Sequence, residues 1–498
     1  MDIKSDISKL VSVFLEKKFN LKTNEIEIQN TKKDFQGDLT IVLFPFYKDL
    51  KKEQISSFGK DLGDSLVSNS ENINSFNIVG GFLNLTISDK YYLNFIESIK
   101  DDIDFGKSKK QNETFIVEFS SPNTNKPLHL GHIRNNLLGY SISKILEANG
   151  KNVKKVQIIN DRGIHICKSM IAWKQYGEGK TPKSENMKGD KFVGDYYILF
   201  DKIHNEQKNE LLKSGIEKDK AEDSTQIMQD AKNELMNWEN NDEETLKIWN
   251  MMNQWVYEGF ESTYNLLGVS FDKNYYESQT YLLGKDIIKE GLSKNVFYAK
   301  EDSSIWINLD DEGLDEKLLL RSDGTSVYMT QDLGTAVQRI SDNENVKGMI
   351  YTVGNEQDYH FNVLFKILKR LGYDWASYLS HLSYGMVDLP SGKMKSREGT
   401  VVDADDLIFE LIDNVKETTE NLDKFKSKNE ALDYEDYKSI ALGALKYYIL
   451  KVDPKKNILF NPEESIDLNG NTGPFIQYAF VRIQSIIKKY NNEISIDK

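Results

Sequence analysis

The sequence predicts an α/β protein built around a doubly wound, Rossmann-type domain, with an N-terminal α+β domain, a largely helical insertion and a C-terminal α-helical region. Strand, loop, helix and strand patterns follow one another from residue 115 to residue 161, and a second such series begins at residue 347. The stretch between the two is helical and highly charged. Two βαβ units separated in this way are typical of one parallel sheet whose chain is interrupted by an insertion.

Composition narrows the class of protein. The chain has 498 residues, and its formal net charge of −14 argues against coating nucleic acid or anionic membranes through bulk positive charge. Cys167 is the only cysteine, which excludes an internal disulfide and a cysteine-rich zinc site. No apolar run approaches the roughly 18 residues that a membrane helix needs. We therefore expect a cytoplasmic protein.

The first unit is expected to span residues 1–108. Apolar residues at Ile3, Ile7, Leu10 and Phe14 recur at helical spacing, which predicts a packed opening helix and not a signal peptide. The runs LTIVLF and FLNLTI are predicted strands, and the polar run DFGKSKKQNET marks the boundary. The pattern favours a small α+β domain.

Residues 109–170 carry the first βαβ unit. FIVEF is a short apolar strand, the loop SSPNTNKPLHLGHIRNN follows it, and apolar residues from Ile133 to Leu146 mark one face of a helix that Gly150 closes. KVQIIND is the next strand. Because open parallel sheets bind ligands at the carboxyl ends of their strands, we expect a nucleotide at this loop.

The rest of the chain divides into three stretches. Residues 171–325 are expected to form the insertion, and residues 326–402 the second half of the Rossmann domain. That half begins with the strand-like run SVYMT. The run KGMIYTV, the helix YHFNVLFKILKRLG, the strand HLSYGMV and the loop DLPSGKMKSREGT follow. Residues 403–498 have a helical pattern.

The first loop places His129 and His132 at the start of a predicted helix. Unpaired backbone N–H groups and the positive end of the helix dipole favour an anion there, and imidazoles can donate hydrogen bonds to phosphate oxygens. Gly131 lets a nucleotide lie close to the backbone, and Lys126 adds a mobile positive charge. Such donors would stabilise the charge that develops during displacement at an α-phosphorus.

Taken alone, the two histidines have a simpler interpretation, in which they merely cap the helix or face solvent. A metal site is a weaker interpretation still, since the pair lacks a third ligand and the helical i, i+4 spacing.

The second loop, GKMKSREGT, places Lys393, Lys395 and Arg397 after a predicted strand, where they suit a polyphosphate. It is not a Walker loop, because six residues separate Gly385 from Gly392 where that motif needs four, and no Ser or Thr follows the lysine. Taken alone, this run favours a solvated basic turn.

Together the two loops resemble the signatures of class I aminoacyl-tRNA synthetases, which are an H-x-G-H loop (the HIGH motif) and a KMSKS-like loop. EFSSPNTNKPLHLGHIRNN is similar to the arginyl-tRNA synthetase form of the first signature. Further motifs resemble that family in the same order, and they read FQGDL, VGGFLNL, INDRG, YMTQDLGTAVQR, VGNEQDYH, GKMKSREGTVVDADDL and NTGPFIQYAFVRI.

The resemblance implies roles for the matching residues. The catalytic set would be His129, His132, Lys126 and Lys393. The ATP contacts would be Gly131, Gly354, His360, Lys393 and Lys395. The arginine contacts would be Glu118, Asn123, Tyr328, Asp332 and Gln357. Ser396 stands where the second lysine of KMSKS is expected, so either Lys126 or Lys395 would take its part.

The chemistry of arginine fits part of this set. A guanidinium has five donors in a plane and is best bound by carboxylates and a hydroxyl group. Tyr328 and Asp332 share one face if residues 328–337 open a helix. The alternative is a tyrosine at a strand end and an acid that caps a helix.

The implied activity is that of an arginine-tRNA ligase. Arginine and ATP would form arginyl-adenylate and pyrophosphate, and arginine would then pass to the 3′ end of tRNA(Arg). Mg²⁺ would accompany ATP, with no tightly bound metal in the protein. The resemblance also implies that the N-terminal unit contacts the tRNA elbow, that tRNA must be present for efficient activation, and that the protein is a monomer.

Two departures and two alternatives accompany this hypothesis. VGGFLNL stands where the family more often has a Gly-Pro-Gly turn, and the sequence stops early in what resembles the helical anticodon-binding domain. One alternative is another H-x-G-H nucleotidyl transferase, such as a synthetase for a different amino acid. The other is a non-catalytic RNA-binding or regulatory module, whose expected marker, a broken first signature, is absent from the sequence.

Overall fold

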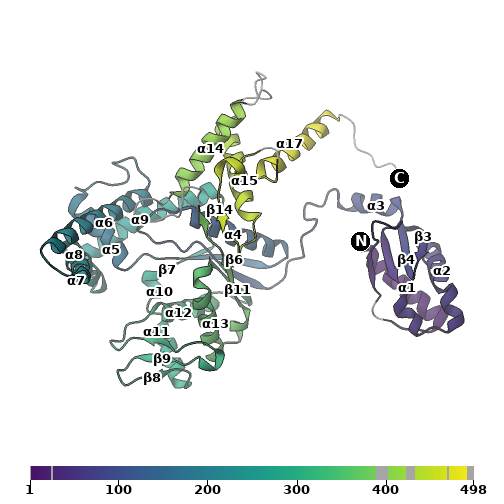
Figure 1. Ribbon diagram of the computed structural model, residues 1–498, viewed down its shortest axis with the longest axis horizontal. Coiled ribbons are helices and arrows are strands. Elements are labelled where there is room, and N and C mark those ends of the chain that lie inside the picture. Colours follow the sequence, from purple (N-terminus) through teal and green to yellow (C-terminus); the bar gives the residue numbers. More distant parts are fainter. Residues whose placement is uncertain (1, 24–25, 389–401, 422–431, 468–469, 491–498) are drawn as a thin grey trace. The chain divides into compact units, whose positions relative to one another are not determined.

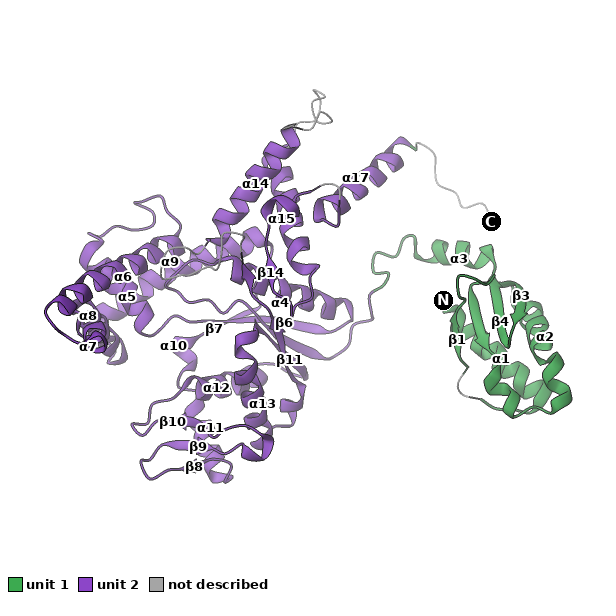
Figure 2. Ribbon diagram, in the orientation of Figure 1, with its two compact units in different colours: residues 1–106, 490–498 green, residues 107–489 purple. Residues whose placement is uncertain are grey.

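The computed structural model describes residues 2–23, 26–388, 402–421, 432–467 and 470–490. The chain divides into two compact units, one of residues 1–106 with 490–498 and one of residues 107–489 (Figure 2). Within the described ranges, no helix is both long enough and apolar enough to cross a membrane.

The first unit packs helices on an antiparallel sheet (Figure 1). Its helices are α1 (Ile3–Phe19), α2 (Lys52–Asn69), α3 (Asp89–Ile99) and the 3-10 helix η1 (Phe44–Lys48). The strand order is β1-β2-β4-β3, formed by β1 (Ile28–Asn30), β2 (Leu39–Val42), β4 (Phe82–Ile87) and β3 (Ile73–Val79). The predicted opening helix and the two predicted strands are confirmed.

The turn between β3 and β4 explains the paired glycines of VGGFLNL. Gly80 and Gly81 have φ values of +55° and +88°, so both central residues of this two-residue hairpin are left-handed. Such a turn matches the twist of the strands, and glycine adopts it without steric cost.

The second unit contains the predicted parallel sheet. Its order is β12-β11-β5-β6-β7, and every adjacent pair is parallel. The strands are β5 (Thr114–Glu118), β6 (Asn152–Ile159), β7 (Lys273–Tyr276), β11 (Val346–Gly354) and β12 (Leu379–Tyr384). The chain runs from β5 outward to β7 and then returns to β11 on the other side. The switch point of the sheet therefore lies between β5 and β11, where such folds bind ligands.

Helices cover this sheet and connect its strands. The crossover helices are α4 (Leu130–Ala148) between β5 and β6, and α13 (Asp358–Arg370) between β11 and β12; α12 (Tyr328–Ser341) precedes β11. One apolar core joins α4 to insertion and C-terminal helices, through side chains such as Ile133 and Phe260. Another packs the sheet against α12 and α13, through Ile116, Leu333 and Leu364. Burying an aliphatic or aromatic side chain of this size contributes roughly 1.5–3 kcal/mol.

The range predicted as an insertion is mostly helical. It begins within α5 (Ile164–Tyr176) and contains α6 (Gly189–Lys213), α7 (Lys218–Ser224), α8 (Gln226–Glu239), α9 (Glu243–Leu267), α10 (Glu277–Thr280) and α11 (Gly284–Ser293). It also contributes β7 to the parallel sheet. A small antiparallel sheet of β8 (Tyr298–Ala299), β9 (Ile305–Ile307) and β10 (Lys317–Leu320) follows, with the 3-10 helix η2 (Asp310–Glu312).

The strand expected at SVYMT does not form, because α12 begins at Tyr328 within that run. The remaining 3-10 helices are η3 (Asn355–Gln357) and η4 (Asp374–Tyr378).

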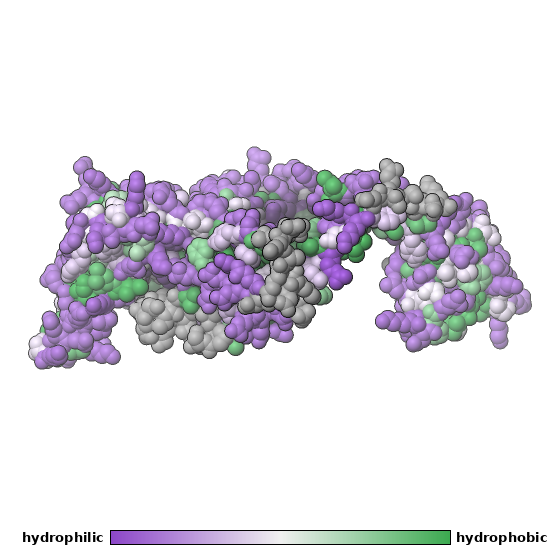
Figure 3. Space-filling view, turned by 90° about the horizontal axis from the view of Figure 1, so that it is seen from above, coloured by the Kyte–Doolittle hydropathy of each residue, from purple (hydrophilic) through white to green (hydrophobic). Residues whose placement is uncertain are grey.

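The C-terminal stretch is helical as predicted, with α14 (Ala404–Asn421), α15 (Tyr434–Leu450), α16 (Pro462–Ser465) and α17 (Gly473–Lys489). Two short strands, β13 (Val387–Asp388) and β14 (Ile458–Leu459), pair in parallel beside it. The face drawn in Figure 3 is mainly hydrophilic, with scattered apolar patches. Phe480 and Ile486 of α17 are among the exposed apolar side chains.

Candidate active site

The two histidines of the first loop are hydrogen-bonded to the start of α4. His129 is the N-cap residue, and its Nδ1 accepts a hydrogen bond from the Gly131 N–H at 3.1 Å. The His132 Nδ1 accepts from the His129 N–H at 3.2 Å. The interpretation that the pair caps the helix is therefore confirmed. Because each Nδ1 is an acceptor, the proton of each neutral ring is on Nε2, and neither Nε2 has a partner among the described residues.

Both imidazoles are held in the neutral form. The pKa of His129 is lowered to about 4, chiefly by burial and secondly by the charge of Lys126. The pKa of His132 lies well below its usual value, first because of burial and then because of His129 and Lys126. The ring centroids are 4.0 Å apart. At neutral pH the pair therefore presents two N–H donors from the N-terminus of a helix, where an anion is favoured.

A cavity of about 520 Å³ lies at the switch point of the sheet, and both histidines line it. Ser120 and Ser121 line it from the end of β5, and Gly354 from the end of β11. Gly354 is buried, and a Cβ there would lie 2.4 Å from the Glu356 carboxylate, so a side chain at this position would require the exposed Glu356 side chain to move. The cavity thus occupies the place where the sequence predicts a nucleotide.

Asn135 of α4 joins three strand ends around this cavity. Its Oδ1 accepts from the Ser120 N–H at 2.5 Å, and its Nδ2 donates to the Thr352 carbonyl at 2.7 Å and to the Tyr384 hydroxyl at 3.0 Å. Ser120 and Ser121 have φ values of +78° and +49°, which side-chain-bearing residues rarely adopt. Such conformations cost about 1–3 kcal/mol each and persist where the surroundings hold them. Asn135 provides part of that constraint.

Three of the five candidate arginine-binding residues lie on α12 or just before α13. Tyr328 is the first residue of α12 and is exposed, and Asp332 follows one turn later on the same face. The Asp332 Oδ2 lies 2.7 Å from the Nε2 of His360. Gln357 is exposed just before α13. The structure therefore brings together Asp332 and His360, which the sequence assigned to different substrates.

Glu118 has a partner within the chain. Its Oε2 forms an ion pair with Nη1 of Arg339 from α12, and its Oε1 accepts from the Ser121 hydroxyl at 3.1 Å. Both members of the ion pair are buried. A direct contact between Glu118 and a substrate stays a prediction.

Sequence reasoning missed Glu277, the first residue of α10. This carboxylate is half-buried and makes no hydrogen bond or ion pair with any residue that the structure describes. The pKa of Glu277 is raised to about 7, chiefly by burial and also by the charges of Asp161 and Asp332, against the opposing effect of Arg162. Glu277 and Asp332 are therefore close enough to interact electrostatically. Glu277 directly follows β7 of the parallel sheet, and a carboxylate at a strand end is a signal for a binding site. That signal was missed because Glu277 falls within the range predicted as an insertion.

Two more predicted residues, Asn123 and Lys126, lie in the first loop. Asn123 forms a parallel bridge with Asn160, where β5 and β6 end. Lys126 and His129 also line a second cavity, of about 350 Å³, against α6. Lys393 and Lys395 lie outside the described residues. Within the described residues, no three His, Cys, Asp or Glu side chains are grouped to hold a metal ion.

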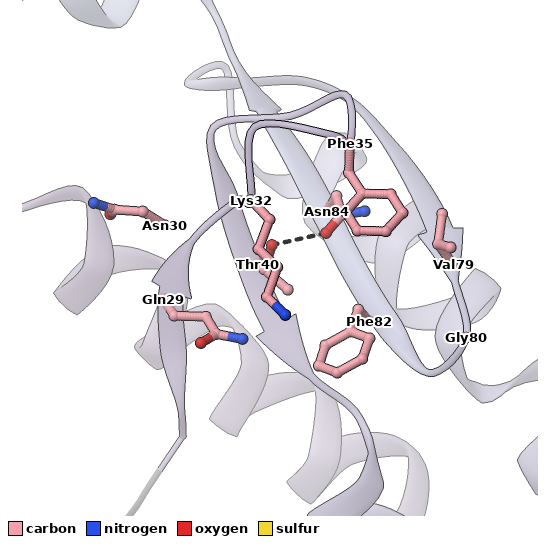
Figure 4. A pocket seen from close by; sticks show the side chains of 9 residues that line it. All are labelled: Gln29, Asn30, Lys32, Phe35, Thr40, Val79, Gly80, Phe82 and Asn84. Carbon is pink, nitrogen blue, oxygen red and sulfur yellow. Dashed lines mark hydrogen bonds between the residues drawn. The ribbon is translucent and has the colours of Figure 1, made fainter.

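The N-terminal unit has a cavity of its own, of about 280 Å³ (Figure 4). Phe35 and Phe82 line it with partly exposed rings. Across from them, Thr40 donates a hydrogen bond to the Asn84 side chain at 2.7 Å. Lys32 adds a positive charge to the rim. Aromatic faces beside amide and ammonium donors suit a nucleobase on an anionic backbone.

Comparisons with known proteins identify the family of the chain. The family model for "tRNA synthetases class I (R), catalytic domain" matches residues 96–461. An arginine–tRNA ligase of Flavobacterium psychrophilum is 53% identical over 507 residues, covering 100% of this chain and 84% of that protein. One from Bacteroides thetaiotaomicron is 52% identical, covering 93% of this chain and 78% of that protein.

A solved structure shares the fold. The arginyl-tRNA synthetase of Thermus thermophilus superposes with a TM-score of 0.71 at 22% identity, covering 100% of this chain and 83% of that chain. The parallel sheet with histidines at its switch point is the catalytic fold of a class I tRNA synthetase. Within that class, the chain belongs to the arginine–tRNA ligase family.

Proposed function

We propose that the chain condenses arginine with ATP to arginyl-adenylate and pyrophosphate, and then transfers arginine to the 3′ end of tRNA(Arg). The reaction follows from its family. The observation that supports the mechanism is the pair of neutral histidines, whose Nε2–H groups are free to donate at the N-terminus of α4.

Activation requires no protein nucleophile. The carboxylate of arginine forms a bond to the α-phosphorus of ATP, and the bond from that phosphorus to the pyrophosphate oxygen breaks. Charge develops on the phosphoryl oxygens, where the Nε2–H groups of His129 and His132 donate hydrogen bonds. Because these donors are preorganised, each is worth about 10²–10³-fold in rate. Binding both substrates at one switch point supplies the remaining advantage through orientation.

Lysines and Mg²⁺ complete the phosphate site in this proposal. Mg²⁺ bound to the ATP phosphates would neutralise part of their charge. We assign Lys126 to the part of the missing KMSKS lysine, because its charge acts on both histidines. Lys393 and Lys395 are proposed as ATP contacts on the strength of the family motif. Gly131 and Gly354 leave room for the nucleotide.

We propose that Asp332 and Glu277 bind the guanidinium of arginine. Asp332 raises the pKa of Glu277 by charge repulsion, and a cation bound between the two carboxylates would relieve that repulsion. Tyr328 supplies a hydroxyl from the same face as Asp332, and His360 orients the Asp332 carboxylate through its 2.7 Å contact. Asn123 and Gln357 are proposed to hold the amino and carboxylate groups of arginine. Glu118 is proposed to act near them while paired with Arg339.

We propose that the N-terminal unit contacts the tRNA elbow through the cavity of Phe35 and Phe82. A monomeric state and a cytoplasmic location stay predictions.

Aminoacylation of tRNA(Arg) with radiolabelled arginine tests this function, with lysine as the control amino acid. Charging with arginine alone is the expected result. A chain that forms an adenylate with another amino acid, or that binds tRNA without charging it, would contradict the proposal.

A further inference from the structure

We propose that Lys188 is a positioning residue for the activation step, because its ammonium group fixes the start of α14 against the backbone of His129. The inference rests on the proposed function for its kinetic readout. It concerns three elements that the predicted site does not include, namely the starts of α6 and α14 and the middle of α9.

The Lys188 ammonium is shared by three helices. Lys188 is the N-cap residue of α6. Its Nζ donates to Asp405 Oδ2 of α14 at 2.6 Å, to Asp190 Oδ2 of α6 at 3.1 Å and to Thr263 Oγ1 of α9 at 2.5 Å. A lysine has three donors, so all of them are used.

The site is largely removed from solvent. The side chain of Asp190 is 0% exposed and that of Asp405 is 12% exposed. Gly259 of α9 packs directly on Asp190, where a Cβ would lie 2.6 Å from a carboxylate oxygen. Two buried carboxylates therefore depend on one cation, and removing that cation leaves uncompensated charge.

The start of α14 is bonded in turn to the first loop. The Ala404 N–H donates to the Leu128 carbonyl at 2.9 Å, and Asp403 pairs with His129 in an antiparallel bridge. Asp405, which accepts a hydrogen bond from Lys188, directly follows Ala404. Ala404 is hydrogen-bonded to the Leu128 carbonyl, and Leu128 directly precedes His129. Lys188 therefore acts on His129 through α14 and touches no substrate itself.

A second ion pair joins the same helices. Lys191 lies one turn further along α6 and contacts Asp406 at 2.9 Å. Both of its side chains are about half exposed, so we expect this pair to contribute little on its own. We therefore expect the buried ion pairs of Lys188 to contribute most of the interaction that holds α14 against α6.

The test compares Lys188→Met and Lys188→Arg with Lys208→Met in the full chain. Lys208 is a matched control, because it is also a lysine of α6 in an ion pair, with Glu222 at 2.9 Å, but it lies away from α14. ATP–pyrophosphate exchange is measured with arginine and tRNA present. We expect Lys188→Met to lower kcat roughly 10- to 100-fold, the cost of a small misplacement of a catalytic group. The KM for arginine should change by less than about twofold, because its pocket lies on other elements.

Two further variants separate positioning from loss of fold. Lys188→Arg should recover most of the rate, because it restores the cation. The triple variant Lys188→Met, Asp190→Asn, Asp405→Asn removes the buried charge, so it should fold like the parent and still be slow. A wild-type kcat in Lys188→Met or in the triple variant would overturn the inference. Equal effects of Lys188→Met and Lys208→Met would do the same.

A measurement independent of activity keeps the inference separate from the proposed function. In histidine-selective NMR, Lys188→Met should shift the ring resonances of His129 and leave those of His204 unchanged, while Lys208→Met should leave His129 unchanged. An unchanged His129 resonance in Lys188→Met would contradict the proposal that Lys188 positions His129 through α14. A wild-type chain without exchange activity would count against the proposed function alone, because the NMR comparison would still decide the role of Lys188.

Discussion

Arginine binding should depend on pH through Glu277. The pKa of this carboxyl is raised to about 7 in the protein without substrate, chiefly by burial. A bound guanidinium favours the ionised form. Arginine should therefore bind most tightly at pH values above the pKa of Glu277, and its affinity should decrease as the pH falls through about 7. The histidines of the first loop do not titrate in this window, since the pKa of His129 is about 4 and that of His132 is well below its usual value.

The size of the effect follows from the pKa. If only ionised Glu277 binds arginine, the apparent Kd is raised by a factor of about 1.1 at pH 8, about 2 at pH 7 and about 11 at pH 6. The expected weakening between pH 8 and pH 6 is thus roughly tenfold, or about 1.4 kcal/mol. At pH 7, binding should release about half a proton per arginine.

Isothermal titration calorimetry at pH 6, 7 and 8, in two buffers of different ionisation enthalpy, measures both quantities. Glu277→Gln is the matched variant, because it keeps the shape of the side chain and removes the titration. It should bind arginine more weakly at pH 8 and lose the pH dependence. If the variant kept the slope of the parent, or if the parent bound equally well at pH 6 and pH 8, Glu277 would not belong to the arginine pocket.

The remaining predictions concern single substitutions. His132→Ala should slow adenylate formation by about 10²–10³-fold in single-turnover assays, and should destabilise the chain by about 1 kcal/mol because it also removes a helix cap; a wild-type rate would exclude it from the mechanism. Asp332→Ala should raise the KM for arginine far more than that for ATP, and equal increases would speak against a guanidinium contact. Arg339→Met should cost about 3–5 kcal/mol in urea unfolding, since it leaves the Glu118 carboxylate buried and unpaired; a loss below about 1 kcal/mol would contradict this. Gly81→Ala should lower the melting temperature measured by circular dichroism, because φ there is +88° and a Cβ would collide with a neighbouring ring; an unchanged value would show that the turn can adapt.

The sequence was informative where one local pattern decides the structure. The apolar runs that became β5 and β6 and the periodic face of α4 are short-range signals, and they located the first loop at a strand end. The positions of His129 and His132 at the start of α4 followed from the same pattern. Their hydrogen bonds explain why capping and catalysis did not have to be alternatives: each ring caps with Nδ1 and keeps Nε2 for a ligand.

Other features depend on contacts between distant segments. The strand β7 is short and polar at its start, so no apolar run announced it, and the position of Glu277 beside the sheet was missed with it. The pairing of Asp332 with His360 joins two helices that only the sheet order brings together. The run SVYMT, which contains β-branched and aromatic residues, has the composition of a strand, but the packing of α12 beside β11 overrides that preference.

We propose that the cavity at the switch point of the parallel sheet and the carboxylates of Asp332 and Glu277 together bind arginyl-adenylate. Calorimetric titration of the full chain with a non-hydrolysable arginyl-adenylate analogue tests it most directly, with the lysyl analogue as the control, because this binding does not depend on the handling of tRNA. The account predicts tight binding of the arginyl compound and at least about a hundredfold weaker binding of the lysyl compound, since a lysyl ammonium cannot satisfy two carboxylates in the planar geometry of a guanidinium. Equal affinity for the two analogues, or no binding of either, would contradict it.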